Sequence, residues 1–156
     1  MRPDSARRGQ GMEGLKLRLL GANDLIDVFS LWKESGLPFK PKGRDSIGHM
    51  TQELAGGSTF LVGAFVGEAM IGVALGTDDG RKGWINRMAV RPAYRRQGVA
   101  KALVEYCEQV FRKRRRVLCC CLIEDWNKAS MELFEAEGYE KREDILYFRK
   151  MLQAEE

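Results

Sequence analysis

The sequence predicts a single α+β domain, with a mixed, mostly antiparallel twisted sheet of six to seven strands flanked by helices. Three observations indicate this class. The length of 156 residues suits one domain. Short apolar runs alternate along the chain with amphipathic segments of helical period. One long amphipathic segment lies between two of these runs, which predicts a central β-α-β unit with a right-handed crossover.

The N-terminal end is polar and differs from the rest of the chain. Residues 1–13 hold three arginines and no apolar stretch, so we expect a disordered tail there, followed by one domain over residues 14–156. Either Met1 or Met12 could be the natural start of the protein.

The first half of the domain is expected to contain strands and helices in turn. A half-buried strand is predicted where apolar and charged residues alternate, and two segments of helical period follow it, separated by a loop with two prolines. Asp45 is the expected N-cap of the second helix, and Gly56–Gly57 ends it. Two apolar runs joined by Gly67–Glu68 predict a hairpin. These elements are expected at residues 15–20 (strand), 21–36 (helix), 36–43 (loop), 45–54 (helix), and 58–66 and 69–77 (strands).

The second half carries the β-α-β unit. Residues 117–123 are apolar at every position, which predicts a strand covered on both faces. The spacing of apolar residues in the long helix predicts an inward face of Val99, Leu103, Tyr106, Cys107, Val110 and Phe111. The expected elements are a strand at 84–90, a turn at 91–94, a helix at 98–113, a strand at 117–123, a helix at 128–136 and a last strand at 145–152.

Composition and charge argue against several classes of function. The net charge is +4, and the first 11 residues contribute half of it, so the near-neutral domain is not expected to bind nucleic acid. The arginine-rich run 112–116 could contact RNA or a cofactor phosphate, but its place at a helix C-terminus also suits the helix dipole. No apolar run is long enough to span a membrane. The four cysteines form no metal-ligand or disulfide pattern, which indicates no metal site and a reducing, cytoplasmic location.

The segment most informative about function joins the strand at 84–90 to the long helix. A turn with Pro92 leads into residues 95–98, and the helix begins without a Ser, Thr or Asp cap. The first turn of a helix presents unpaired N–H groups and about half a positive charge. Gly98 lets a ligand approach the backbone, and Arg95, Arg96 and Lys101 add cations. The segment therefore predicts a phosphate or diphosphate site, and an ordinary helix start with solvated arginines is the alternative.

These residues resemble the signature of the GNAT superfamily of N-acetyltransferases. The matching residues are Arg95, Gly98 and Ala100 for its Arg/Gln-x-x-Gly-x-Gly/Ala motif, residues 88–95 for the preceding strand and turn, and Asn127 with Glu137-Gly138-Tyr139 for its later Asn…Gly-Phe/Tyr segment. The order of elements agrees from about residue 15 to residue 152, so the resemblance covers nearly the whole domain.

The resemblance implies acetyl-coenzyme A as cosubstrate, without a metal, bound where two parallel strands splay apart. It implies that backbone groups of Met88 and Val90 pair with the pantetheine arm and that amides from about Arg96 to Lys101 hold the diphosphate. Asn127 would hydrogen-bond near the cofactor arm, and it also suits a plain helix N-cap. The cofactor-binding residues implied in this way are Met88, Ala89, Val90, Arg95, Arg96, Gln97, Gly98, Val99, Ala100, Lys101, Asn127 and Phe134.

The sequence departs from the family pattern at the position of the general acid. Phe134 stands where many members have a tyrosine that protonates the departing thiolate. The loss is tolerable, because a thiol pKa near 8.5 makes the thiolate a stable leaving group. Tyr139 and Tyr147 are candidate replacements only by proximity in sequence, and core or sheet positions are the alternative for both.

A second departure concerns the general base. Some members carry a glutamate on the strand before the turn, where this chain offers Trp84 and Asn86. The candidate catalytic residues are therefore Asn86, with Glu124 and Asp125 beyond the next strand as carboxylates that could relay a proton through water. The alternative is that both carboxylates are solvated loop residues.

The residues and the resemblance together predict an acetyl-coenzyme A-dependent N-acetyltransferase that acts on a primary amine by direct attack in a ternary complex. The acceptor could be a small molecule, a peptide or a protein N-terminus, and the missing base favours an amine of low pKa, such as an α-amine. The chain is expected to be a monomer or a homodimer. The alternative is a catalytically weak acyl-coenzyme A-binding module that acts as a sensor or partner subunit.

Overall fold

The computed structural model describes residues 12–154. The strands of this part of the chain form one five-stranded sheet. The strands lie in chain order, and all neighbours are antiparallel except β4 and β5, which are parallel. The predicted α+β class and β-α-β unit are confirmed, with five strands instead of six to seven. The predicted tail lies outside the described residues except for Met12 and Glu13, which lead into β1. The strands are β1 (Leu15–Leu19), β2 (Thr59–Val66), β3 (Ala69–Asp78), β4 (Gly83–Val90) and β5 (Cys119–Cys121).

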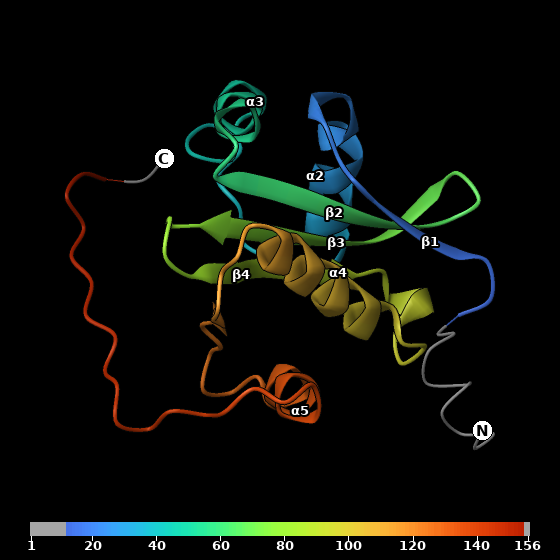
Figure 1. Cartoon of the computed structure of the whole chain (residues 1–156). Helices are drawn as coiled ribbons and strands as arrows, with labels where there is room; N and C mark the ends of the chain where they lie inside the picture. Colours follow the sequence, from blue (N-terminus) through green and yellow to red (C-terminus); the bar gives the residue numbers. More distant parts are fainter. Residues whose placement is uncertain (1–11, 155–156) are drawn as a thin grey trace, which may run out of the picture.

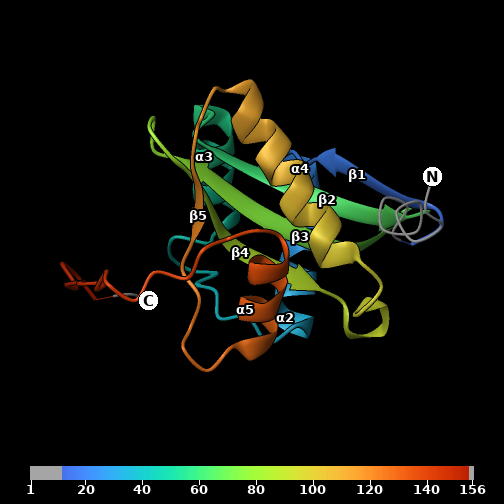
Figure 2. The same cartoon turned by 60° about the horizontal axis from the view of Figure 1, so that its bottom comes forward.

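Helices cover both faces of the sheet (Figure 1, Figure 2). Helices α2 and α3 lie on one face, and α4 lies on the other with α5 beside it. None of the helices in the described part of the chain has the length and apolarity needed to cross a membrane. The helices are α2 (Leu25–Glu34), α3 (Ile47–Gly56), α4 (Val99–Lys113) and α5 (Lys128–Ala136), with short 3₁₀ turns η1 (Ala22–Asp24) and η2 (Pro92–Tyr94).

Two apolar clusters hold these layers together. The cluster between α4 and the sheet includes Val62, Ile71 and Leu103, and the cluster on the side of α2 and α3 includes Trp32 and Leu61. Successive residues of β2 enter different clusters because side chains alternate between the two faces of a strand. The central strands are therefore apolar at nearly every position.

Two glycines in the strands let α4 lie close to the sheet. A Cβ at Gly72 would lie 2.9 Å from Cγ1 of Val99, and a Cβ at Gly83 would lie 2.4 Å from the ring of Phe111. Both ends of α4 are thus fixed over β3 and β4. The helix occupies nearly the predicted range, and its buried residues are Val99, Leu103, Val104, Cys107 and Phe111.

The prediction of a last strand at 145–152 is wrong, because these residues form no regular structure and are exposed. A strand forms only where a neighbouring strand completes its hydrogen bonds, and apolar composition does not show whether such an edge is in reach. The strand predicted at 117–123 is also shorter and only half-buried over Cys119–Cys121, with Leu118 and Leu122 exposed. Its expected coverage on both faces is therefore wrong as well.

The second helix has a different cap from the predicted one. Ser46 is the N-cap of α3, and its Oγ accepts a hydrogen bond from the His49 backbone N–H at 3.2 Å. Asp45 instead turns inward and is 5% exposed. Asp and Ser both cap helices well, so the local sequence does not distinguish them, and the buried partners of Asp45 decide. Gly57, with a φ of 82°, ends the helix as predicted.

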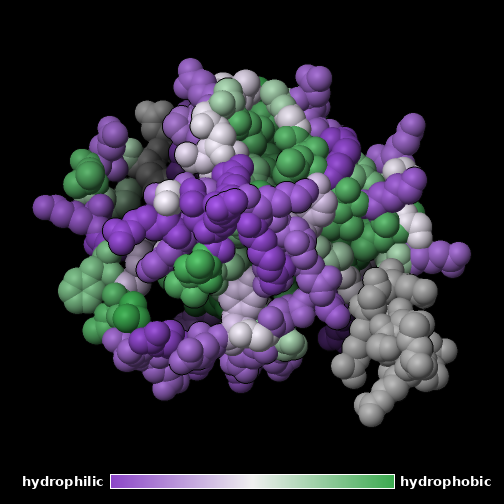
Figure 3. All heavy atoms as spheres, in the orientation of Figure 1, coloured by the Kyte–Doolittle hydropathy of each residue, from purple (hydrophilic) through white to green (hydrophobic). Residues whose placement is uncertain are grey.

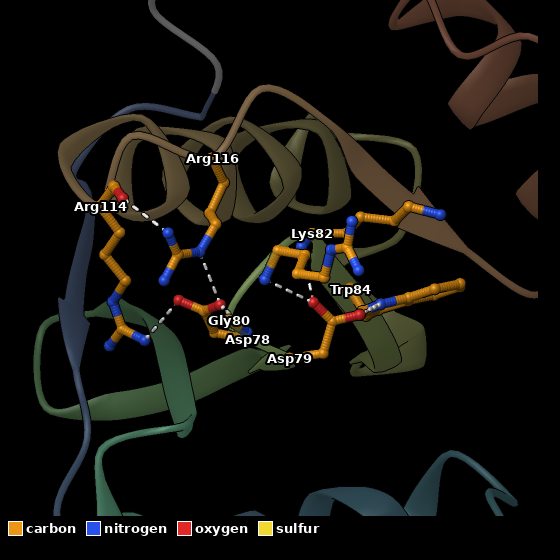
Figure 4. Close-up of polar contacts among 8 residues, drawn as sticks. Asp78, Asp79, Gly80, Lys82, Trp84, Arg114 and Arg116 are labelled. Carbon is orange, nitrogen blue, oxygen red and sulfur yellow. Dashed lines mark hydrogen bonds and ion pairs between the residues drawn. The ribbon is translucent and has the colours of Figure 1, made fainter.

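A buried carboxylate joins the end of β3 to the segment after α4 (Figure 4). Asp78 accepts hydrogen bonds from Arg116 Nε at 2.7 Å, from Arg114 Nη1 at 3.3 Å and from the Gly80 backbone N–H at 2.8 Å. The hydrogen bond from Arg116 contributes most to holding the pKa of Asp78 below its ordinary value of 3.8. Two members of the arginine-rich run 112–116 thus have a structural role.

Replacement of Asp78 by asparagine should lower the free energy of unfolding by about 2 kcal/mol at pH 7, because it leaves two partly buried guanidinium groups without their anion. A lowered carboxyl pKa contributes stability above its ordinary value of 3.8 and loses it as the pH falls further. The difference between the two proteins should therefore shrink in acid. Urea unfolding at pH 7 and at pH 3 measures the difference in the free energy of unfolding. Asp27→Asn, on the exposed face of α2, is the control. An equal difference at pH 7 and pH 3 would contradict it.

Candidate functional site

Helix α4 begins at Gly98 without a side-chain cap. Gly98 has a φ of 84°, in the left-handed region that glycine enters without strain, and its carbonyl accepts from the Ala102 N–H at 3.1 Å. The first turn of an α-helix has N–H groups without intrahelical acceptors and carries about half a positive charge. This helix end therefore attracts an anion and presents backbone donors to it.

The loop before α4, residues 95–98, lies next to the start of the helix. Arg96 has a φ of 61°, and only Arg115 shares such a value among the described non-glycine residues. Arg95 Nε donates to the Val90 carbonyl at 3.2 Å, which ties the loop to the end of β4. Residues 95–98 are exposed. A strained backbone conformation of this kind costs on the order of 1 kcal/mol and is concentrated at functional sites.

The parallel strands β4 and β5 separate next to this helix end. Their pairing covers only Gly83–Ile85 against Cys119–Cys121, whereas β4 continues to Val90. In the register with β3, Arg87 faces Leu75 and Ile85 faces Gly76, so Asn86 is the extra residue of a β-bulge. Beyond the bulge, the described residues provide no strand partner for the β5-facing edge of β4. The predicted splayed strands are confirmed.

The candidate cofactor residues on β4 and α5 differ in burial and in their partners. Met88 and Val90 are half-buried at the end of β4. Asn127 is the N-cap of α5, and its Oδ1 accepts from the Ser130 N–H at 3.1 Å, which confirms the capping interpretation. Phe134 is 5% exposed, and its ring meets that of Tyr139 edge-on at 4.9 Å.

The candidate catalytic residues fall into two environments. Glu124 and Asp125 are exposed in the loop between β5 and α5. Asn86 is exposed on β4, and its side-chain amide donates to Thr77 Oγ1. Trp84 donates from Nε1 to Asp79 at 3.1 Å (Figure 4). All three candidates lie within four residues, along the chain, of the last β4–β5 pair, which joins Ile85 and Cys121. No hydrogen bond among the described residues joins their side chains into a catalytic group.

Tyr139 has partners that sequence reasoning did not find. Its hydroxyl lies 2.8 Å from Glu108 Oε2, to which it donates, and 3.2 Å from Cys119 Sγ. Burial first, and then these two contacts, raise the pKa of Tyr139 well above its ordinary value. Tyr147 is exposed in the C-terminal segment. Tyr139 thus has a core role, and its proton is held by the carboxylate on α4.

On the side of the sheet that α2 and α3 cover, a buried ion pair fixes the loop between these two helices. Asp45 accepts from the Lys40 N–H at 2.6 Å and lies 3.3 Å from Arg87 Nη1. The Arg87 guanidinium stacks 4.5 Å above the ring of Trp32. No sequence pattern singles out Asp45 and Arg87 as a pair, because they belong to different elements. The pair connects the loop to the strand that borders the gap.

The family to which the chain is similar agrees with the sheet and helix arrangement described above. The model of the acetyltransferase (GNAT) family matches residues 25–139, which is most of the chain. The chain belongs to the GNAT family. As a member of that family, this GNAT protein is an acetyltransferase.

Individual relatives resemble the GNAT chain over nearly their whole length. Acetyltransferase SG1711 of Sodalis glossinidius is 26% identical over 140 residues, which cover 88% of this chain and 96% of that protein. Aminoglycoside N-acetyltransferase AAC(6')-Iy, solved with the bisubstrate analogue CoA-S-monomethyl-acetylneamine, has a TM-score of 0.75 at 19% identity, covering 88% and 98%. The PaiA N-acetyltransferase of Thermoplasma acidophilum, solved with coenzyme A, has a TM-score of 0.74 at 17% identity, covering 84% and 92%.

Replacement of Asp45 by asparagine should release the loop at 37–46, because Arg87 loses its anion. Trypsin should then cleave after Lys42 at least about tenfold faster, since cleavage follows the population of the opened loop. Mass spectrometry of the first fragments measures this. Asp27→Asn, which removes an exposed carboxylate from α2, should leave the cleavage rate unchanged. Equal rates in both variants would show that the ion pair does not hold the loop.

Proposed function

We propose that this chain transfers an acetyl group from acetyl-coenzyme A to a primary amine by direct attack in a ternary complex. The observation that carries the proposal is the uncapped start of α4 beside the unpaired end of β4. The uncapped helix start suits a diphosphate, and the unpaired strand edge suits an extended arm that contains amide groups. Their adjacency matches a ligand that contains both groups.

The residues present fit the donor chemically. The glycine start of α4 and the exposed Arg95 and Arg96 offer backbone donors and positive charge to phosphate oxygens. Met88 and Val90 would add backbone hydrogen bonds along the free edge of β4, as an added strand does. Gln97, Ala100 and Lys101 would complete this surface, and Asn127 would border it from α5. The side chains of Ala89 and Val99 are buried, so these two residues could offer only backbone groups. Phe134 supports the α5 side from the core.

Acetyl-coenzyme A would supply the acetyl group as a thioester, which an unprotonated amine attacks to give an amide and a free thiol, the proton lost by the nitrogen ending on the departing sulfur. The chain's own part is to hold both reactants in contact and to polarise the carbonyl with backbone donors. That proton would pass from the nitrogen to the sulfur through water, for which Glu124 and Asp125 are candidate relays and Asn86 a candidate hydrogen-bonding partner. No side chain in the described site needs to act as a strong base if the amine arrives neutral.

The need for the amine to arrive unprotonated favours an acceptor amine of low pKa. At pH 7, keeping a lysine-type amine neutral costs about 4.6 kcal/mol, whereas an α-amine costs about 1 kcal/mol. We therefore propose an α-amine or a similar amine, on a small molecule, a peptide or a protein N-terminus. We also propose a cytoplasmic location, which the four free cysteines support. The likeness to an aminoglycoside N-acetyltransferase supports an amine acceptor in general.

Replacement of Gly98 by glutamate should reduce coenzyme A affinity by at least about 100-fold, or about 2.7 kcal/mol, because a negative side chain occupies the anion-binding helix end. Titration calorimetry with coenzyme A measures the loss. Gly67→Glu is the matched control: it also places glutamate at a glycine with positive φ, 60°, in the β2–β3 turn. Undiminished affinity in Gly98→Glu would refute the phosphate site. Equal losses in both variants would point to a general effect on folding.

At pH 7, thiol release should be faster with the dipeptide Ala-Gly than with Nα-acetyl-lysine amide, because only the α-amine is substantially neutral. The rate with the lysine acceptor should rise about tenfold for each pH unit up to pH 9, while the α-amine rate levels off near pH 8. Equal rates at pH 7 would contradict the acceptor proposal. Coenzyme A binding without thiol release across a panel of amines would favour an acyl-coenzyme A-binding module. Two departures from the family pattern support that alternative: Phe134 replaces the usual tyrosine, and β4 carries no glutamate.

A further inference from the structure

A row of side chains crosses the sheet on the side of α2 and α3. The register pairs Thr59 with Thr77 and Thr77 with Trp84. It also pairs Trp84 with Cys120, so the row runs from β2 to β5. Residues paired across strands share a face of the sheet. Ile85, which follows Trp84, is buried in the cluster under α4, so the row belongs to the face that α4 does not cover.

Helix α3 packs on the β2 end of this row (Figure 1). Thr59 is 8% exposed there, and its hydroxyl donates to Glu53 of α3 at 3.1 Å. Thr77, Trp84 and Cys120 are each only half-buried, so the row opens to solvent as it crosses from β3 to β5. An indole that is open on the surface of a sheet is a platform on which a flat apolar group can stack.

The indole of Trp84 is held in one orientation (Figure 4). Its Nε1 donates to Asp79 at 3.1 Å, and the same carboxylate accepts from the backbone N–H groups of Lys82 at 2.6 Å and Arg81 at 2.8 Å. The hydrogen bond from Lys82 contributes most to lowering the pKa of Asp79 to about 2, so this acceptor stays charged throughout the neutral range. The β3–β4 turn thus preorganises the platform.

Trp84 lies next to the point where the proposed function places the thioester. The free edge of β4 runs from Asn86 to Val90, and the loop before α4 is tied to its Val90 end. A coenzyme A arm that starts at that helix end would bring its thioester to the Asn86 end. Asn86 donates to Thr77 of the row, and it stands two residues, or about 6.6 Å along a strand, from Trp84.

The side of the sheet that carries Trp84 is the more accessible approach to this point. On the other side, apolar residues such as Ile85 and Cys107 fill the space under α4, and polar side chains cover the outer surface of α4 (Figure 3). In an α-amine with an aromatic side chain, only the α- and β-carbons separate the nitrogen from the ring. That separation is comparable with the step from Asn86 to Trp84.

We propose that Trp84 selects the acceptor by stacking on an aromatic side chain carried by the same carbon as the reacting α-amine. This inference rests on the proposed function and deepens it, because it names the side chain that the acceptor carries. Trp84 acts in binding and specificity and takes no part in bond making. On the strand where some family members carry a glutamate, this chain thus offers an aromatic surface.

Thiol release at pH 7 with the dipeptides Phe-Gly and Ala-Gly tests the assignment. In the wild type, kcat/KM should be at least about tenfold higher for Phe-Gly, because stacking and apolar burial both favour its ring. Trp84→Leu should lower this ratio at least about fivefold, mainly through a higher KM for Phe-Gly, while Ala-Gly still reacts. Trp84→Phe keeps a ring and should keep most of the ratio. Comparing ratios between proteins removes the difference in pKa between the two amines.

Trp126→Leu is the matched control. It removes a tryptophan that is 72% exposed, from the loop before α5 and outside the row. The ratio should stay at the wild-type value in this variant. A wild type without preference for Phe-Gly, an unchanged ratio in Trp84→Leu, or an equal fall in both variants would overturn the proposal. Each of these results leaves the proposed function standing, because Ala-Gly still releases thiol.

Binding of the product separates the two claims further, since it needs no turnover. Titration calorimetry of the coenzyme A-saturated protein with N-acetyl-Phe-Gly should show affinity at least about fivefold weaker in Trp84→Leu and unchanged in Trp126→Leu. If neither dipeptide releases thiol, the proposed function is wrong, and calorimetry alone then decides the role of Trp84. Equal affinities in the wild type and Trp84→Leu, or no binding to either, would overturn the assignment.

Discussion

The position of helix α4 against the sheet is the constraint on which the rest of this structure depends. Gly72 and Gly83 remove the side chains that would otherwise stand between the sheet and Val99 or Phe111. The helix can therefore approach β3 and β4 along its whole length. Its first turn consequently lies at the end of β4, where β4 has already left β5. The uncapped helix start and the unpaired strand edge meet there because α4 packs closely on the sheet, and the hydrogen bond from Arg95 to the Val90 carbonyl adds to this contact.

Polar contacts then hold the surroundings of this site in place. Asp78 ties the segment after α4 to the end of β3, and Asp45 ties the loop between α2 and α3 to β4. Both carboxylates are almost fully buried. A buried carboxylate is costly without a partner, so each of these pairs keeps two elements together strongly.

Sequence reasoning succeeded where a pattern is local. The period of α4, its missing cap and the glycine before it are visible in consecutive residues, and all three are found in the structure. It failed where a distant residue decides. Ser46 and not Asp45 caps α3 because Arg87 and Lys40 hold Asp45, and no local pattern contains that information. The segment 145–152 has the composition of a strand, but whether it forms one depends on an edge supplied elsewhere.

The site shows the same division. The uncapped helix start, where we propose that the diphosphate binds, is visible in residues 95–101, whereas only the resemblance to a family predicts the gap between β4 and β5. Nitrogen-15 NMR of the full chain with added coenzyme A tests the central claim most directly. The largest shift changes should fall on the amides of residues 96–101, with smaller changes at Met88 and Val90. Saturable binding that leaves the amides of 96–101 unshifted would contradict the claim that the start of α4 holds the diphosphate.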